Sequence, residues 1–374
     1  MKMRGMQRLR VWTARLLAIL IWSGVLIVSA LLVRSDLFVR ERAITVLAWA
    51  GSIDRTTLKR FEAETGIRVF FNTYATNEEL LVKLRATGGA GYDLVFPSDY
   101  GVRKLIDEGL IKKIDKQRCL FWRDLNPLLM GLYYDPTNDY SIPFGWDLYC
   151  IGIDRRRVDP AHVKNGWDLI FPAPETRARL VMSNDPLEAL LFAYVACGHR
   201  DATRADIEAL RQMDEGRRAG LSAGLLRILR SQRRHVEAYA SVRADYFLGM
   251  GYVDAAIMQT TDLFRAMKGF KDIDFVVPFP AFVTVENSAI PAASTKDDMV
   301  YAFLNFLYRP TTIIEQFAFC PTPPVRSDVL DSLKLSPRYR ALMSPSPEDF
   351  QKYLFIADVF PEAMRYDLWV AVKS

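Results

Sequence analysis

The order of secondary-structure patterns between residues 44 and 109 constrains the fold more than any other feature of the chain. Three β-rich runs, "ITVLAWA", "IRVFFNTY" and "YDLVFPS", alternate with segments whose apolar residues recur at helical spacing. Thr76 with Glu79 three residues later forms a capping box at the start of the second helix. Strands joined by single helices lie parallel and are linked by right-handed crossovers. The sequence therefore predicts a doubly wound α/β sheet whose strand ends bring Trp49 and residues 98–100 to one crevice.

A second α/β unit follows the segment "YSIPFGWDLYCIGID", where Pro143 and Gly145 punctuate a run that crosses from one unit to the next. This unit holds a strand pattern at 180–183, a long helical region from about Arg204 to Gln232, and the strands "VDAAIMQ" and "IDFVVPF". The chain then recrosses at "AFVTVENSAIPA". We expect a ligand cleft between two lobes, the first made of residues 43–147 plus 286–328 and the second of 148–285 plus 329–374.

The first 42 residues have the pattern of an exported N-terminus. Five basic residues precede an apolar run of 18 residues from Leu16 to Val33, which is just long enough to span a bilayer. Val28-Ser29-Ala30 suits a signal peptidase, but apolar residues continue beyond it, so we favour an uncleaved anchor over a cleaved signal peptide. The same 42 residues carry eight Lys and Arg against two acids, so the rest of the chain is close to neutral although the net charge is +5. That balance gives no electrostatic reason to expect nucleic-acid binding.

Sequence signatures of catalysis, cofactor binding and metal binding are missing. The chain has no GxxxxGK[ST] loop, no HExxH and no GxSxG motif, and the glycines at 88, 89 and 91 follow a helix rather than a strand. We therefore expect no enzyme activity, no cofactor and no metal. The cysteines form no CxxC pair, and we expect buried free thiols, with a Cys119–Cys150 disulfide as the alternative; the four are Cys119, Cys150, Cys197 and Cys320.

One cluster of basic residues lies within the long helical region. It consists of Arg227, Arg230, Arg233 and Arg234, which recur at the spacing of one helix face. We interpret this cluster as a solvated surface rather than an anion site.

Two carboxylates lie where a buried strand gives way to a helix, in "LVMSNDPLEALLFAY" from 180 to 194. Asp185 precedes Pro186, and Glu188 follows Asp185 by three residues, which is an acidic form of the capping box. The carboxyl ends of parallel strands are also where open α/β sheets bind ligands. The residues alone leave both roles open, and Asp185 could fill both.

Several stretches of the sequence resemble the spermidine/putrescine-binding proteins of bacterial ABC importers. They include "FEAETGIRVFFNTYATNEELLVKL", "YDLVFPSDYGVRKLIDEGLIKKID", "GWDLIF", "ENSAIPA", "FLNFLYRP" and "PTPPVR", and the similarity runs from about Ile44 to at least Ser327. "FPSDY" followed by "NDYSIPFGW" is the most specific part. The resemblance implies a two-lobed periplasmic binding protein fold of the α/β class (type II-like). It also implies a periplasm-facing protein, tethered if the anchor is kept, that delivers a polyamine to an ABC permease and its ATPase.

A polyamine carries ammonium groups that need carboxylates when they leave water, and methylene spacers that suit apolar or aromatic walls. The resemblance implies such roles for two carboxylates of the second lobe, Asp185 and Glu188, and for a third, Glu286, where the family usually has Asp. It implies an aromatic wall at Trp49. Further contacts are implied at Ser98, Tyr100 and Ser241.

The chain departs from the family in the aromatic part of the site. Ser52 and Cys320 stand where the family has Tyr, and Met258 and Thr284 stand where it has Trp. Phe282 or Phe319 could fill part of the space. These departures are compatible with weaker polyamine binding or with another cationic ligand, and the long apolar segment leaves a membrane-tethered polyamine sensor as an alternative. Met258 and Cys320 are included among the expected ligand-binding residues.

Overall fold

The computed structural model describes residues 20–27, 42–173, 175–196, 198–240 and 243–374. The chain divides into two units, Met1–Ala43 and Ile44–Ser374. In the first unit residues 20–27 are helical, and the remainder of the predicted anchor, including Val28-Ser29-Ala30, lies outside the described residues. Within the part of the chain that the structure describes, no helix is both long enough and apolar enough to cross a membrane.

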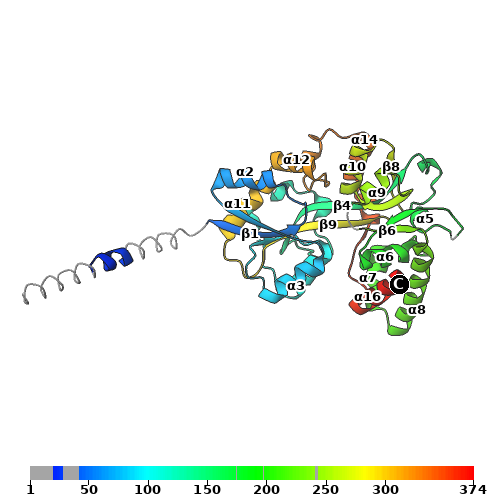
Figure 1. The fold of residues 1–374 in the computed structure, drawn as a ribbon, viewed down its shortest axis with the longest axis horizontal. Helices are drawn as coiled ribbons and strands as arrows, with labels where there is room; N and C mark the ends of the chain where they lie inside the picture. Colours follow the sequence, from blue (N-terminus) through cyan, green and yellow to red (C-terminus); the bar gives the residue numbers. More distant parts are fainter. Residues whose placement is uncertain (1–19, 28–41, 174, 197, 241–242) are drawn as a thin grey trace, which may run out of the picture. The chain divides into compact units, whose positions relative to one another are not determined.

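The elements of the first lobe follow the predicted alternation (Figure 1). They are β1 (Ala43–Trp49), α2 (Arg55–Thr65), β2 (Arg68–Tyr74), α3 (Asn77–Thr87), β3 (Leu94–Val95) and α4 (Asp99–Asp107). One half of the capping box predicted for α3 is confirmed, because the Thr76 side chain accepts a hydrogen bond from the Glu79 amide. The Glu79 carboxylate, however, accepts from the amide of Ala75 rather than from that of Thr76. Gly66 ends α2 in the left-handed conformation that glycine adopts without strain.

The second lobe begins after the crossing strand and contains the predicted strands and one more. Its elements are α5 (Trp167–Ile170), β5 (Leu180–Met182), α6 (Pro186–Ala196), α7 (Arg204–Ala209), α8 (Glu215–Arg233), β6 (Val236–Tyr239), α9 (Ala244–Gly249), β7 (Ala255–Gln259), α10 (Thr260–Gly269) and β8 (Ile273–Val276). The region predicted as one long helix is divided into α7 and α8. Strand β6 was not predicted, because its short segment becomes a strand only through pairing with β5.

Two long strands, β4 (Ser141–Asp154) and β9 (Phe282–Ala289), connect the lobes (Figure 1). They pair with each other in antiparallel fashion within the strand order β2-β1-β3-β9-β4-β7-β5-β6. Parallel pairing, as predicted for the first lobe, joins β1 with β3. In the second lobe β5 also pairs in parallel with β6 and β7. The register of β4 against β9 shifts between Pro143 and Gly145, and a Cβ at Gly145 would lie 2.8 Å from Thr322 Cγ2. A side chain at this position would therefore have to displace the methyl group of Thr322.

The C-terminal part of the chain returns to both lobes. It contains α11 (Asp297–Leu307), α12 (Pro310–Phe319), α13 (Ser327–Leu330), α14 (Pro337–Met343), α15 (Pro347–Lys352), β10 (Leu354–Phe355) and α16 (Glu362–Lys373). Strand β10 runs parallel to β9, and α16 packs against α6 and α8. The end of the chain thus lies on the second lobe.

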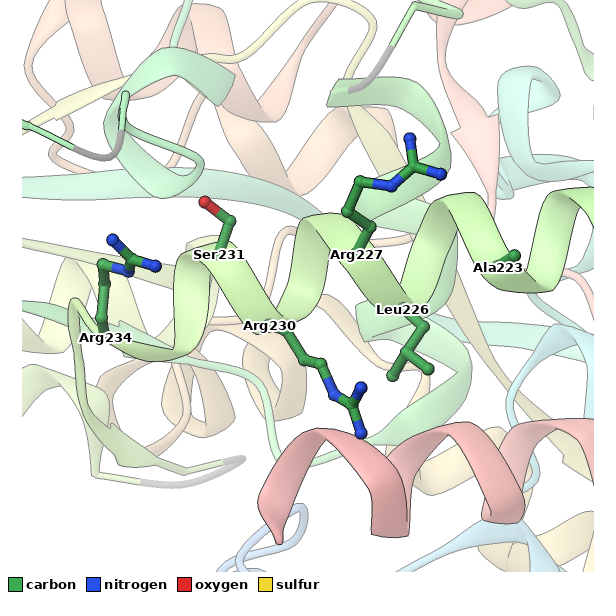
Figure 2. A pocket seen from close by; sticks show the side chains of 6 residues that line it. All are labelled: Ala223, Leu226, Arg227, Arg230, Ser231 and Arg234. Atoms are coloured by element: carbon green, nitrogen blue, oxygen red, sulfur yellow. The ribbon is translucent and has the colours of Figure 1, made fainter.

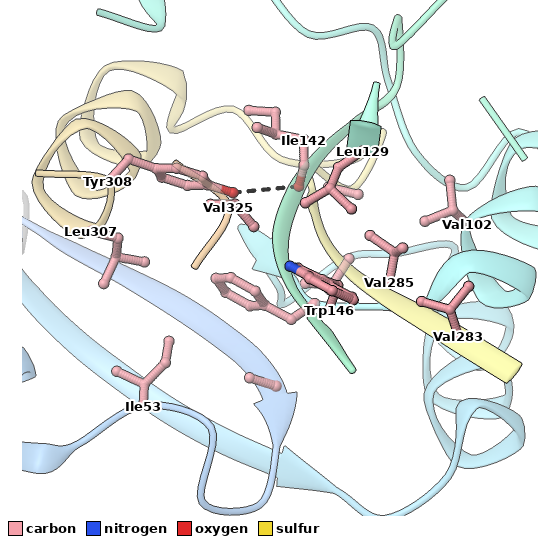
Figure 3. Packing of buried hydrophobic residues seen from close by; sticks show 14 of the residues in the cluster. Ile53, Val102, Leu129, Ile142, Trp146, Val283, Val285, Leu307, Tyr308 and Val325 are labelled. Carbon is pink, nitrogen blue, oxygen red and sulfur yellow. Dashed lines mark hydrogen bonds between the residues drawn. The ribbon is translucent and has the colours of Figure 1, made fainter. Parts of the chain in front are cut away.

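Apolar side chains from β4, β9 and α11 meet in a core that surrounds the crossing strands (Figure 3). Trp146 is 1% exposed, and the neighbouring Tyr308 donates a hydrogen bond to the Ile142 carbonyl at 3.4 Å. A second core, in the second lobe, packs the rings of Trp167, Phe192 and Phe282 against one another in tilted and edge-on arrangements. Burial of such aromatic surface is the main stabilising contribution in both cores.

The cysteines that the structure describes form no disulfide. Cys119 and Cys150 are buried free thiols, as expected, and Cys320 is half-buried and free. Cys197 lies outside the described residues.

Two glycines test how tightly the second lobe packs. A Cβ at Gly249 would approach the Phe270 ring to 2.2 Å, whereas a Cβ at Gly220 in α8 meets nothing within 4 Å. We expect Gly249→Ala to lower the free energy of unfolding by about 1–3 kcal/mol, because the half-buried ring must move. Gly220→Ala should raise it by about 0.5–1 kcal/mol through helix propensity. Denaturant unfolding of both variants checks this, and equal effects would contradict it.

Candidate functional site

Asp185 lies at the N-terminus of α6, where its carboxylate caps the helix. Oδ1 accepts hydrogen bonds from the amides of Leu187 at 2.8 Å and Glu188 at 3.1 Å. The Asp185 amide in turn donates to Ser183 Oγ at 3.1 Å. The capping role is therefore confirmed. Both bonds end on the same oxygen, and Oδ2 takes part in no hydrogen bond with the described residues, which leaves it available to a ligand.

Glu188 belongs to the first turn of α6 and is held by two hydroxyl groups. It accepts hydrogen bonds from Tyr149 of β4, at 2.5 Å, and from Ser183. The Tyr149 hydroxyl also accepts from Gln259 Nε2 of β7 at 3.1 Å. Tyr149 and Gln259 were not predicted. They meet because they face each other in the antiparallel register of β4 and β7, which the sequence does not reveal.

The two second-lobe carboxyls hold protons more firmly than free carboxyls do. Burial, followed by repulsion from Asp185, raises the pKa of Glu188 to about 7. Burial also raises the pKa of Asp185, with Glu78 adding to the rise and the amides of α6 opposing it. Neighbouring carboxyls of this kind share protons near neutral pH, and a cation placed between them would favour their ionised forms.

The first-lobe side of the site pairs an indole with the third carboxylate. Trp49, at the end of β1, donates its Nε1 hydrogen to Glu286 of β9. Glu286 lies opposite Gly145 in the β4–β9 register and forms a β-bridge with Ser98. Burial, and then the charge of Asp99, raises the pKa of Glu286 well above its usual value. The Tyr74 ring packs 4.6 Å from that of Trp49, an aromatic neighbour that was not predicted.

Tyr100 links the two sides. It lies in the first turn of α4, is 8% exposed, and donates its hydroxyl hydrogen to Glu78 at 3.4 Å. Burial, then the charge of Asp185 in the second lobe, raises the pKa of its hydroxyl well above the usual value. Ser98 is 3% exposed and bonded to Asn77, so it positions the start of α4.

The predicted carboxylates lack basic partners at ion-pair distance. Among the described residues, Asp185, Glu188 and Glu286 form no ion pair, and their partners are amides, hydroxyls and an indole. Some other buried carboxylates are matched to bases, as in Asp154–Arg156 at 2.7 Å and Asp93–Lys296 at 3.0 Å. Others form no ion pair with the described residues and are bonded to amides or hydroxyls instead; these are Asp99, Asp135 and Asp147. Desolvated acids without an ion-pair partner are suited to bind a cation from solution.

Three other predicted residues show no contact with Asp185, Glu188 or Glu286 in the described part of the chain. Met258 and Cys150 face each other across β7 and β4, on the side opposite Tyr149 and Gln259, and Met258 packs into the core over Gly152. Cys320 follows α12 and contacts Thr322 Oγ1 at 3.3 Å. Ser241 lies outside the described residues.

The two phenylalanines considered as replacements for the missing aromatic walls are differently placed. Phe282 is fully buried against Phe192 in the second core, so it does not fill the site. Phe319, at the end of α12, is 47% exposed. Thr284 of β9 is buried and lies opposite Asp147 of β4.

The basic cluster of α8 borders an open hollow on the second lobe (Figure 2). Arg230 points toward α16 and donates to the Ala371 carbonyl at 3.2 Å, whereas Arg227 and Arg234 point away from that helix. The residues that line the hollow come from α8 and from Arg234, which follows the helix directly. These observations agree with a solvated face.

The residues that the structure describes contain no group of three His, Cys, Asp or Glu side chains able to hold a metal ion.

Comparison with known proteins identifies the family. The model for bacterial extracellular solute-binding proteins matches residues 56–341. The chain belongs to this family. It is 30% identical to the spermidine/putrescine-binding periplasmic protein of Escherichia coli over 279 residues, which is 74% of this chain and 76% of that protein. It is 29% identical to the putrescine-binding periplasmic protein SpuD of Pseudomonas aeruginosa over 354 residues, 89% of this chain and 92% of the relative.

Solved structures of other binding proteins share the two-lobed fold. The substrate-binding protein PotD of a spermidine/putrescine ABC transporter from Streptococcus pneumoniae superposes with a TM-score of 0.70 at 20% identity, covering 88% of this chain and 98% of that one. Iron-bound HitA from Pseudomonas aeruginosa also superposes, with a TM-score of 0.61 at 15% identity over 89% of this chain and 99% of HitA. These likenesses establish the fold, and the lining of the site must decide the ligand.

The raised pKa of Glu188 predicts how stability depends on pH in the ligand-free protein. Its folded pKa of about 7 lies above the usual value of 4.5, so the folded state holds the proton more tightly. Stability should therefore fall as pH rises from about 4.5 to 7, by about 1–3 kcal/mol. Glu188→Gln removes this titration and should flatten the profile. Urea unfolding at several pH values checks it, and the same slope in both proteins would contradict the assignment.

Proposed function

We propose that this protein binds a polyamine, of the spermidine/putrescine class, between its two lobes. The observation that carries the proposal is the set of carboxylates without basic partners, Asp185 and Glu188 from α6 and Glu286 from β9. Each can neutralise an ammonium group that leaves water. Trp49, Tyr74 and Tyr100 offer aromatic faces beside them, which suit both cations and methylene spacers.

The relatives support this choice among cationic ligands. The relative from Escherichia coli that matches 74% of this chain is named for spermidine and putrescine, and SpuD, which matches 89% of it, is named for putrescine. An anion would need Arg or Lys at the positions held by the three carboxylates. The protein is proposed to act without catalysis, as a receptor that delivers its ligand to an ABC permease and its ATPase on the periplasmic side of the inner membrane.

Ligand capture is proposed to close the lobes about β4 and β9. The proposed lobes are residues 43–147 plus 286–328 and residues 148–285 plus 329–374. In support, α16 packs against α6 and α8 on the second lobe, and the crossing strands hold the register shift at Gly145. A ligand that touches Trp49 and Asp185 together stabilises the closed form, because it gains both contacts only there.

Titration calorimetry tests the proposed function directly. Putrescine, spermidine and spermine are each titrated into the ligand-free protein, and at least one should bind at micromolar protein concentration. The acidic amino acid glutamate serves as an anionic control and should give no heat. Absence of binding for all three amines would overturn the proposal.

Asp185→Asn separates ligand binding from helix capping. The Asn side chain keeps an oxygen that can accept from the amides of Leu187 and Glu188, so the melting temperature should change little. Loss of the charge should weaken polyamine binding by more than tenfold.

The matched control is Asp214→Asn, since Asp214 caps α8 through the Arg217 amide at 2.9 Å. It should leave affinity unchanged. A large loss of stability in Asp185→Asn with unchanged affinity would instead assign Asp185 to capping alone.

The apolar segment from Leu16 to Val33 is proposed to tether the receptor to the inner membrane. Its 18 residues reach the length of a spanning helix, and apolar residues continue past Val28-Ser29-Ala30. Cell fractionation should therefore recover the protein with membranes, and N-terminal sequencing should find the segment retained. A mature chain that begins near Leu31 and is released with the soluble periplasm would contradict the tether.

A further inference from the structure

Arg365 is a buried base close to the acidic site, on an element that the sequence did not connect with it. It belongs to α16 and is only 4% exposed. Its guanidinium lies 3.4 Å from Asp358 Oδ1 and 3.5 Å from Glu78 Oε1. Glu78 is in the first turn of α3, in the first lobe, so the pair with Arg365 spans the two lobes.

The surroundings of Arg365 join the predicted ligand residues. Glu78 also accepts the hydroxyl hydrogen of Tyr100 at 3.4 Å. Lys104 of α4 pairs with Asp358 at 2.6 Å and lies 5.8 Å from the centre of the Tyr100 ring. The charge of Arg365 lowers the pKa of Asp185, against the larger effect of burial, so the guanidinium is within electrostatic range of that carboxylate.

We propose that Arg365 limits the number of ammonium groups that the site accepts, by occupying with its own charge the position beside Glu78 and Asp185. This inference rests on the proposed function and adds a selectivity to it. The site prefers diamines and triamines, such as putrescine and spermidine, over the tetraamine spermine.

The charges at the site support this preference. Glu78, Asp185, Glu188 and Glu286 provide four carboxylates, and Arg365 already compensates the first of them. Three carboxylates remain for a ligand, which matches the charge of a triamine at most. A fourth ammonium would lie beside a desolvated guanidinium with no free acid, and like charges repel strongly where water is excluded.

Arg365→Gln tests the proposal. The substitution leaves Glu78 bonded to Tyr100 and Asp358 bonded to Lys104, so both acids keep a donor. Spermine should then bind at least tenfold more tightly than to the original protein, whereas putrescine affinity should change less than threefold. Calorimetry with both amines measures the ratio, and thermal melting confirms that the variant is folded.

Three further variants keep the result interpretable. Arg365→Lys retains the charge and should retain the discrimination against spermine. Glu78→Gln leaves Arg365 without its first-lobe acid and should weaken spermine binding further relative to putrescine. Arg211→Gln is the matched control, because Arg211 lines the same surface hollow as Arg365 yet pairs only with Glu208 at 3.3 Å. It should change neither affinity.

The outcomes distinguish this inference from the proposed function. If the original protein binds polyamines and Arg365→Gln alters all affinities equally, the selectivity role is overturned and the proposed function stands. If Arg365→Gln does not fold, an unchanged ratio in Glu78→Gln overturns the role in the same way. If the original protein binds none of the amines, the proposed function and this inference fail together.

Discussion

Carboxylates that are shielded from water without a basic partner determine how this site works. A desolvated acid is stable only when it is protonated, hydrogen-bonded or matched by a positive charge. The protein supplies hydrogen bonds from amides, hydroxyls and an indole to Asp185, Glu188 and Glu286, but no ion-pair partner among the described residues, so under the proposed function the ligand brings the matching charge. The raised pKa of Glu188 is the signature of this incomplete compensation.

The fold makes such an arrangement possible because it assembles the site from separate pieces. The end of β1 supplies Trp49, the start of α4 supplies Tyr100, and the start of α6 supplies Asp185 and Glu188. Residues at the ends of strands and in the first turns of helices present their side chains from a backbone that the sheet holds in place. Solved structures with this fold include the substrate-binding protein of a spermidine/putrescine transporter and iron-bound HitA, so one scaffold serves proteins named for very different ligands.

Local sequence patterns predicted those parts of the site that depend on neighbouring residues. The cap at Asp185 follows from Pro186 and Glu188, and the strand–helix alternation of the first lobe follows from apolar periodicity. Contacts that depend on the register between paired strands could not be predicted from the sequence. A shift of one residue between β4 and β7 decides that Gln259 rather than Met258 meets Tyr149, and such a shift reverses every side chain of a strand. Arg365 and Glu78 are 287 residues apart in sequence, so nothing local joins them.

Glu286 is carried by one of the two strands on which the lobes would turn, opposite the glycine where their register slips. A small rotation of the lobes already changes the surroundings of a residue on these crossing strands, whereas residues in the outer parts of the lobes must move farther. Ligand binding at Glu286 would therefore be coupled directly to closure of the lobes. A permease that recognises the closed form would then detect the ligand-bound state through the crossing strands, without contacting the ligand itself.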